Sequence, residues 1–213
     1  MGLCTAAVRL HPRFGEAEAN RAASTAAIDA AAAAGARLVV LPELCSSGYC
    51  IATEAEADSA CEPLDGPTVA AWTAAARRHD LVIVGGLAER DDDGAVAALA
   101  DRGAELLVFP SNLTDDPPIT VRDHVYTAVA RAEAHRNRTA IVVADRCGTE
   151  RGATWTGAAI IIDATGALIG APLHDDDRPE LVIADLPTPG QRETAWGDAN
   201  DVVGDRRPDL FSG

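Results

Sequence analysis

Short apolar runs alternate along the chain with longer alanine-rich stretches that also carry charged residues. The short runs predict buried β-strands, and the longer stretches predict helices because alanine has the highest helix propensity. The predicted strands up to residue 145 are residues 3–10, 38–42, 81–87, 105–110 and 139–145. The predicted helices are residues 16–34, 68–80, 95–103 and 125–137. Strands that alternate with helices indicate an α/β fold in which helices cover the sheets.

The pattern changes after Gly157, where short apolar runs follow one another with only tight turns between them. These runs are residues 158–163, 166–172 and 180–186. Because tight turns join antiparallel neighbours, the runs predict hairpins that complete a sheet.

Two stretches of the chain resemble each other. "GARLVVLPEL" (residues 35–44) and "GAELLVFPSNL" (residues 103–113) share a Gly-Ala pair, an apolar run and a proline. This echo suggests two related sheets packed face to face, although a chance match of a common helix-to-strand joint explains it equally well. Glu43 in the first copy corresponds to Ser111 in the second. A carboxylate at the end of a buried strand either caps other groups by hydrogen bonding or takes part in a reaction.

Composition narrows the class of protein. The chain has 213 residues and no glycine- or serine-rich linker, which predicts a single domain over residues 1–213. A hydrophobic share of 47% with only 4% aromatic residues indicates a core of small aliphatic side chains. The net charge of -15 argues against partners such as nucleic acid or an anionic membrane. No apolar run is long enough to span a membrane and no signal peptide is evident, so we expect a cytoplasmic protein.

The basic residues and the cysteines limit the chemistry. All 18 basic residues are arginines, so the chain contains no lysine. The odd number of cysteines predicts free thiols rather than a disulfide framework, and their spacing is a poor zinc pattern. We therefore expect neither a metal nor another cofactor. The cysteines are Cys4, Cys45, Cys50, Cys61 and Cys147.

Several motifs, taken in order, resemble those of the nitrilase-like carbon-nitrogen hydrolases. They are "NRAASTAAIDAAAAAGARLVVLPELCSSGY", "RGAELLVFPSNL", "ARAEAHRNRTAIVVADRCGTERGATWTGAAIIIDATGALIGAP" and "NDVVGDRRPDLF". The resemblance covers nearly the whole chain. It implies a four-layer α-β-β-α sandwich that associates into a homo-oligomer, a dimer or higher. It also implies hydrolysis of a small amide, nitrile or carbamoyl compound through a cysteine thioester, without a metal.

The resemblance also assigns residues to roles. The catalytic set of the family is a glutamate base, a lysine that stabilises the tetrahedral intermediate and a cysteine nucleophile. Glu43 stands at the position of the base, and Tyr49 and Asn112 stand at positions close to the pocket. For Tyr49 and Asn112, a packing aromatic and a turn amide are equally good interpretations.

The lysine and the nucleophilic cysteine of the family have no counterparts in this sequence. The family's middle segment carries both, and it would lie between "VIVGGLAER" and "ALADRGAELL". This chain instead passes from Arg90 to Ala97 through a short acidic loop. The resemblance therefore implies an internal deletion near residues 90–97 and one shortened sheet. Exposed strand edges then predict a marginally stable or oligomer-dependent fold.

Other residues of the chain are candidate substitutes for the missing groups. Cys147 follows a predicted strand and could replace the nucleophile, but a small buried hydrophobe is the plainer interpretation. Cys45 lies close to Glu43 in the sequence and is no better a candidate. His124 and His135 would suit a Cys-His hydrolase, yet no Cys-His signature accompanies them. Solvated or capping histidines are favoured.

Two hypotheses follow from these residues. In the first, the chain hydrolyses carbon-nitrogen bonds with Glu43 as the base, but no nucleophile can be named. In the second, the deletion has impaired or abolished catalysis, and the chain persists as a binding or assembly subunit or as a degenerate gene product. We favour the second hypothesis, because one event removes both the lysine and the cysteine.

Overall fold

A computed structural model of the chain describes residues 2–88, 105–114, 120–174 and 178–187. The strands are β1 (Leu3–Arg9), β2 (Leu38–Val40), β3 (Val82–Val84), β4 (Leu106–Ser111), β5 (Ala140–Asp145), β6 (Cys147–Glu150), β7 (Ala153–Thr156), β8 (Ile160–Ile162), β9 (Leu168–Gly170) and β10 (Glu180–Leu186). The helices are α1 (Ala17–Ala33), α2 (Glu54–Ala60), α3 (Pro67–His79) and α4 (Val125–Asn137).

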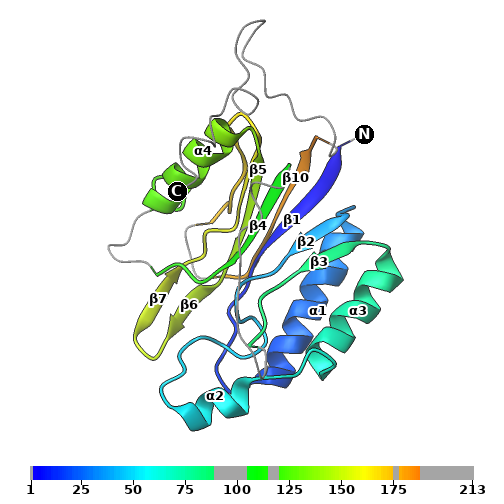
Figure 1. Ribbon diagram of the computed structural model, residues 1–213, viewed down its shortest axis with the longest axis vertical. Helices are drawn as coiled ribbons and strands as arrows, with labels where there is room; N and C mark the ends of the chain where they lie inside the picture. Colours follow the sequence, from blue (N-terminus) through cyan, green and yellow to red (C-terminus); the bar gives the residue numbers. More distant parts are fainter. Residues whose placement is uncertain (1, 89–104, 115–119, 175–177, 188–213) are drawn as a thin grey trace, which may run out of the picture.

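The described strands form two four-stranded sheets and one separate hairpin (Figure 1). The first sheet has the order β10-β1-β2-β3, and its strands β1, β2 and β3 are parallel. The second sheet has the order β4-β5-β8-β9, in which β4 and β5 are parallel. Strands β6 and β7 form a separate antiparallel hairpin, and an isolated bridge joins Trp155 of β7 to Thr114.

The prediction for the last three strands is partly wrong. Strands β8 and β9 form the expected antiparallel pair. Strand β10 instead returns to the first sheet, where it pairs antiparallel with the whole of β1 and places Leu3 opposite Leu186. This pairing buries Val182 and Leu186 between the two sheets, so the apolar side chains of β10 stabilise both sheets at once.

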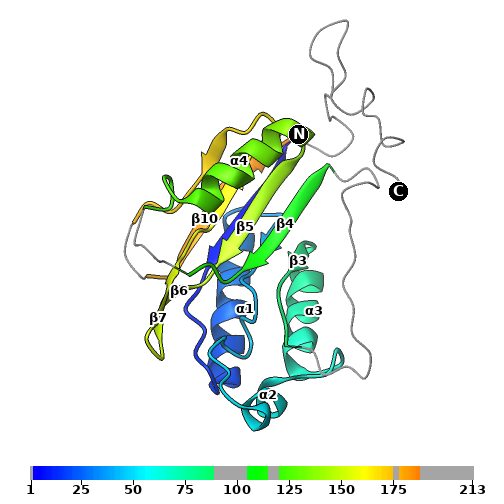
Figure 2. The ribbon, with the colours of Figure 1, turned by 60° about the vertical axis from the view of Figure 1, so that its left-hand side comes forward.

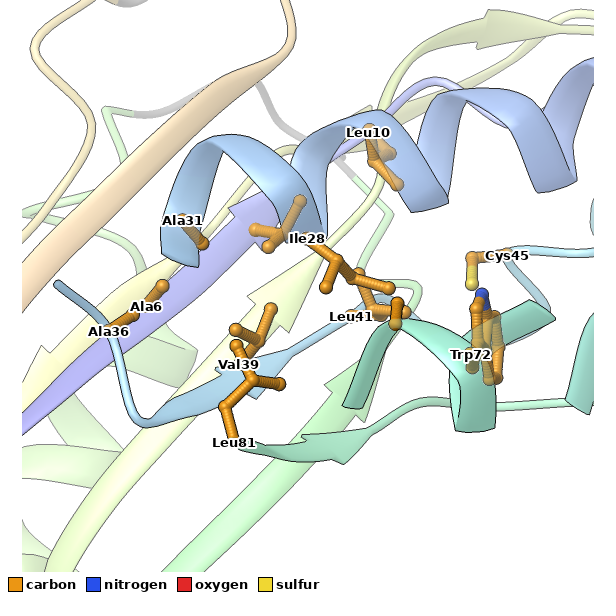
Figure 3. Packing of buried hydrophobic residues seen from close by; sticks show 12 residues of the cluster. Ala6, Leu10, Ile28, Ala31, Ala36, Val39, Leu41, Cys45, Trp72 and Leu81 are labelled. Carbon is orange, nitrogen blue, oxygen red and sulfur yellow. The ribbon is translucent and has the colours of Figure 1, made fainter. Parts of the chain in front are cut away.

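The layers follow the order helix, sheet, sheet, helix, as the resemblance implied. Helices α1 and α3 cover the outer face of the first sheet, and Figure 3 shows the core between them, in which Ile28, Val39 and Leu41 meet. The two sheets face each other across a second core that includes Ala7, Val40, Val142 and Ile161. Helix α4 covers the outer face of the second sheet (Figure 2).

Local signals in the sequence explain where the main helices end. Helix α1 stops before Gly35, whose φ of 91° lies in the left-handed region that glycine adopts without strain. Its neighbour α3 begins with Pro67, which suits the first turn of a helix. The indole of Trp72 on α3 donates to Ser24 Oγ on α1 at 3.0 Å. The two helices are therefore joined by a polar contact inside an otherwise apolar layer.

Most of the predicted elements are confirmed, with differences at their ends. Strands β2 and β3 are shorter than expected, and α2, β6 and β7 were not predicted. The predicted helix 95–103 and the proposed deletion near residues 90–97 lie outside the described residues, so the shortened sheet stays a prediction. No helix within the described ranges is long and apolar enough to cross a membrane.

Candidate active site

Glu43 lies just beyond the carboxyl end of β2, where the backbone turns sharply. Leu44 has a φ of 48°, a left-handed conformation that is uncommon for a residue with a side chain. Gly86, which follows β3, donates its backbone N–H to the Pro42 carbonyl at 3.3 Å. A Cβ atom at position 86 would lie 2.6 Å from Glu43 Cα, so only glycine fits there. The end of β3 thus fixes the backbone that presents Glu43.

The second sheet supplies the side-chain contact of Glu43. Asn112, which follows β4, donates its Nδ2 to the Glu43 carbonyl at 2.9 Å and to Glu43 Oε2 at 3.3 Å. The Glu43 N–H in turn lies 3.4 Å from the Ser111 carbonyl. The structure therefore brings together Glu43 and Asn112, two residues that the sequence nominated separately. Glu43 is half-buried, and within the described ranges no ion pair reaches its carboxylate.

A buried carboxylate holds the segment that follows Asn112. Asp145, at the end of β5, accepts from the backbone N–H groups of Leu113 and Arg146 at 3.0 Å each. Its other oxygen accepts from Thr156 Oγ1 at 2.6 Å and from the Ala158 N–H at 3.0 Å. Burial raises the pKa of Asp145, and these four donors oppose that effect by favouring the charged form. Asp145 therefore anchors the loop that aims Asn112 at Glu43.

The thiols considered as nucleophiles are both buried. Cys45 is a core residue whose side chain points toward the indole of Trp72 (Figure 3). Its burial raises the pKa of the Cys45 thiol to about 12, so this thiol is neutral at physiological pH. Cys147 begins β6, is fully buried, and lies with its Sγ 3.4 Å from the Leu10 carbonyl as a hydrogen-bond donor. A catalytic role for Cys147 stays a prediction.

The remaining candidates lie at the margin of this region or away from it. Tyr49 is 42% exposed and packs edge-on against Trp155 with ring centroids 6.2 Å apart. His124 caps α4, because its Nδ1 accepts from the Tyr126 N–H at 3.3 Å. His135 is exposed and its Nδ1 contacts the Thr165 carbonyl at 2.9 Å. The expectation of capping or solvated histidines is confirmed for both.

All five cysteines are free, and no three His, Cys, Asp or Glu side chains of the described ranges could hold a metal.

Sequence reasoning missed one ionic group near these strand ends. Arg146 directly precedes β6 and Glu150 ends it. Their side chains form a buried ion pair of 3.1 Å. Glu150 contacts Cys50 and Phe14, which lie 100 and 136 positions away in the chain, so no local pattern could have revealed its role. The only signal was its place inside the long motif that begins at Ala130.

The sequence of this chain is similar to those of known proteins. A sequence model of the carbon-nitrogen hydrolase family matches residues 4–96. A nitrilase from Pyrococcus abyssi is 23% identical over 264 residues, which cover 96% of this chain and 97% of that protein.

Solved structures show the same fold. One is a mutant of the amidase from Nesterenkonia sp. AN1 with the acetamide moiety of fluoroacetamide added to its active-site cysteine. Its TM-score is 0.70 at 18% identity, over 99% of this chain and 95% of that one. Another is a CN-hydrolase superfamily protein from Xanthomonas campestris with an arsenic adduct in its active site. Its TM-score is 0.71 at 17% identity, over 86% of this chain and 90% of that one.

Proposed function

This chain belongs to the nitrilase-like carbon-nitrogen hydrolase superfamily, and we propose that it receives a small amide or nitrile beside Glu43 but is impaired in hydrolysing it. The contact between Asn112 Nδ2 and Glu43 Oε2, at 3.3 Å, carries this proposal. It fixes the Glu43 carboxylate where the two facing sheets meet, and a carboxylate oxygen can accept a hydrogen bond from the N–H group of an amide. Acrylamide is the ligand of one related amidase, which supports a small amide here.

Glu43 supplies a carboxylate that could serve as a general base, but no thiol is placed for it to activate. A carboxylate base activates a thiol only when the thiol lies within hydrogen-bond reach. Cys45 is neutral and points into the helix-covered core, and Cys147 donates to Leu10. The chain has no lysine to stabilise an oxyanion. Both gaps support impaired catalysis.

We attribute both losses to a deletion within a single domain, residues 1–213, near residues 90–97. The alignment with the Pyrococcus abyssi nitrilase spans 264 positions, whereas this chain has 213 residues. At least 51 aligned positions of the relative therefore have no counterpart here. This shortfall supports the loss of a segment large enough to carry a lysine, a cysteine and the strands that present them.

A non-catalytic subunit that assembles with copies of itself is the second candidate. Helix α4 carries exposed apolar side chains, with Val125 at 61%, Tyr126 at 48% and Val129 at 54% exposure. Val125 and Val129 are four residues apart and share one face of the helix. Exposed apolar groups on one helix favour contact with a second copy. Replacing both valines with glutamate is expected to lower the oligomeric state, which sedimentation velocity would measure; an unchanged state contradicts this surface as the interface.

The test of the proposed function separates binding from turnover. The purified chain is incubated with acetamide, acrylamide and propionitrile while ammonia release is followed, with Glu43→Gln and Cys147→Ala as controls. We expect no turnover above the uncatalysed rate. Turnover that disappears in both variants would overturn the impaired assignment. Binding is followed separately by NMR titration with acetamide, and we expect Glu43→Gln to abolish it.

A further inference from the structure

The buried ion pair between Arg146 and Glu150 has no place in the proposed chemistry. Arg146 Nη1 donates to Glu150 Oε2 at 3.1 Å, and the two side chains are 0% and 11% exposed. Removing both charges from water is unfavourable unless further hydrogen bonds satisfy them. The contacts of each partner therefore show what the pair is for.

Glu150 collects backbone N–H groups from two loops. Its Oε1 accepts from Phe14, in the loop after β1, at 2.5 Å. Its Oε2 accepts from Cys50 at 3.2 Å and from Tyr49 at 3.4 Å, both in the loop after Glu43. The two loops also touch directly, because a Cβ atom at Gly48 would lie 2.5 Å from the Phe14 nitrogen. One carboxylate thus ties the loops that follow β1 and β2.

Arg146 fixes the same region from the opposite side. Its Nη2 donates to the Pro12 carbonyl at 2.7 Å, and its guanidinium lies 3.8 Å from the ring centroid of Trp155. Trp155 in turn packs against the Tyr49 ring. Burial acts to raise the pKa of Glu150, but the amides of Phe14 and Cys50 and the Arg146 charge hold it below its ordinary value. The carboxylate is therefore charged at neutral pH.

We propose that Arg146 and Glu150 are the positioning pair of the amide site: they hold the loop of residues 44–50, which directly follows Glu43, and keep Tyr49 against Trp155. Neither residue needs to touch the ligand, because both act through the backbone of that loop. The ligand class is a small uncharged amide, so this inference rests on the proposed function. It adds that the rigidity of the 44–50 loop, rather than Glu43 alone, sets the affinity.

The experiment compares two isosteric substitutions in the full-length chain. Glu150→Gln removes the charge and sets an NH2 group against donors in either orientation of the amide: against the Phe14 N–H at one position, or against the Tyr49 and Cys50 N–H groups at the other. Glu133→Gln is the matched control, because Glu133 forms an ion pair with Arg136 on α4, away from the 44–50 loop. Acetamide affinity is measured by NMR titration, and amide hydrogen exchange reports the opening of the loop.

We expect Glu150→Gln to weaken acetamide binding about tenfold, and to speed exchange at Tyr49 and Cys50 about tenfold or more, because a hydrogen bond to a charged group is lost. Exchange in β1 and all values for Glu133→Gln should match the wild type. Wild-type affinity in a folded Glu150→Gln variant overturns the inference and leaves the proposed function standing.

Two further outcomes are informative. If Glu150→Gln does not fold, Glu150→Asp keeps the charge but is too short to reach Phe14 and Cys50 together, so the same loss of affinity is expected; unchanged affinity overturns the inference. If the wild type itself does not bind acetamide, the proposed function fails. The exchange rates then still decide whether the pair holds the loop, since unchanged rates at Tyr49 and Cys50 contradict it.

Discussion

The two copies of the strand-proline pattern begin alike and end in different surroundings. Leu41 and Phe109 occupy the same place in the two copies, yet Leu41 is 0% exposed and Phe109 is 47% exposed. Strand β2 lies between β1 and β3, whereas β4 pairs only with β5 among the described strands. An apolar run therefore predicts a strand, but the neighbours at both edges decide how deeply it is buried.

The polar ends of the two copies differ in chemistry and meet in space. Glu43 ends the first copy, and Ser111 with Asn112 ends the second. These residues contact each other where the two sheets meet. Asn112 Nδ2 donates to the Glu43 carbonyl, and the Glu43 N–H donates to the Ser111 carbonyl. The apolar halves of the pattern build two facing sheets, and the polar halves supply different groups to one shared site.

The largest expected difference between the copies lies in their buried side chains. Leu41→Ala should lower the free energy of unfolding by about 2 to 5 kcal/mol, because it leaves a cavity between the first sheet and its helices. Phe109→Ala, at the matching position, should cost about 1 kcal/mol or less because its side chain is half exposed. Urea denaturation of both variants measures the contrast. Equal losses would contradict it and indicate that Phe109 is covered in solution.

The sequence alone predicts these elements well where one pattern dominates. The alanine-rich helix α4 has the predicted bounds, Val125–Asn137. The β6–β7 hairpin escaped prediction because its strands are short and its turn is Arg151-Gly152, in which both residues have positive φ. Such a turn usually signals itself with Asn-Gly or Asp-Gly. The pairing of β10 with β1 was missed for another reason, since hairpin logic favours the nearest strand.

Some residues of the candidate site could likewise be predicted from the sequence, and others could not. Glu43 and Asn112 were predicted from short motifs, and their contact joins residues 69 positions apart. Arg146 and Glu150 were missed because their roles lie in contacts to Pro12, Phe14 and Cys50, which only the folded chain brings near. Motifs thus locate groups with intrinsic chemistry, whereas residues that act by holding loops emerge only from three-dimensional packing.

A smaller effect is expected when the two copies are made to end alike. Asn112→Asp places a second carboxylate against Glu43 and removes the Nδ2 donor. The variant should lose about 1 to 3 kcal/mol at pH 8 from the lost hydrogen bond and the like-charge contact. Because salt screens the repulsion between two carboxylates, this deficit should shrink when the NaCl concentration is raised at pH 8. Asn112→Ala loses the donor without adding charge, so its deficit should stay constant over the same range of salt. Urea denaturation at low and high salt tests this, and parallel behaviour of the two variants would refute the charge repulsion.

The smallest expected effect concerns the segments that follow the two copies, both of which reach the β6–β7 hairpin. The first segment is held there by Arg151, which contacts Glu56 at 2.9 and 3.0 Å, and the second by the Thr156 N–H, which donates to the Leu113 carbonyl at 2.9 Å. The Arg151 hydrogen bonds lower the pKa of Glu56 from 4.5 to about 2.

A lowered carboxyl pKa means that this contact contributes fully above pH 4.5 and is lost as the pH falls toward 2. Acid should therefore loosen the segment around Glu56 as the pH falls toward 2. The segment around Leu113 is held by a different carboxylate, Asp145, which accepts from the Leu113 N–H and from Thr156 Oγ1. NMR titration of the Glu56 carboxyl should give a midpoint of about 2 in the wild type. The midpoint should move up toward 4.5 in Arg151→Ala, in which only the backbone hydrogen bonds to Glu56 remain to lower its pKa. A wild-type midpoint near 4.5 would show that the ion pair with Arg151 does not persist in solution.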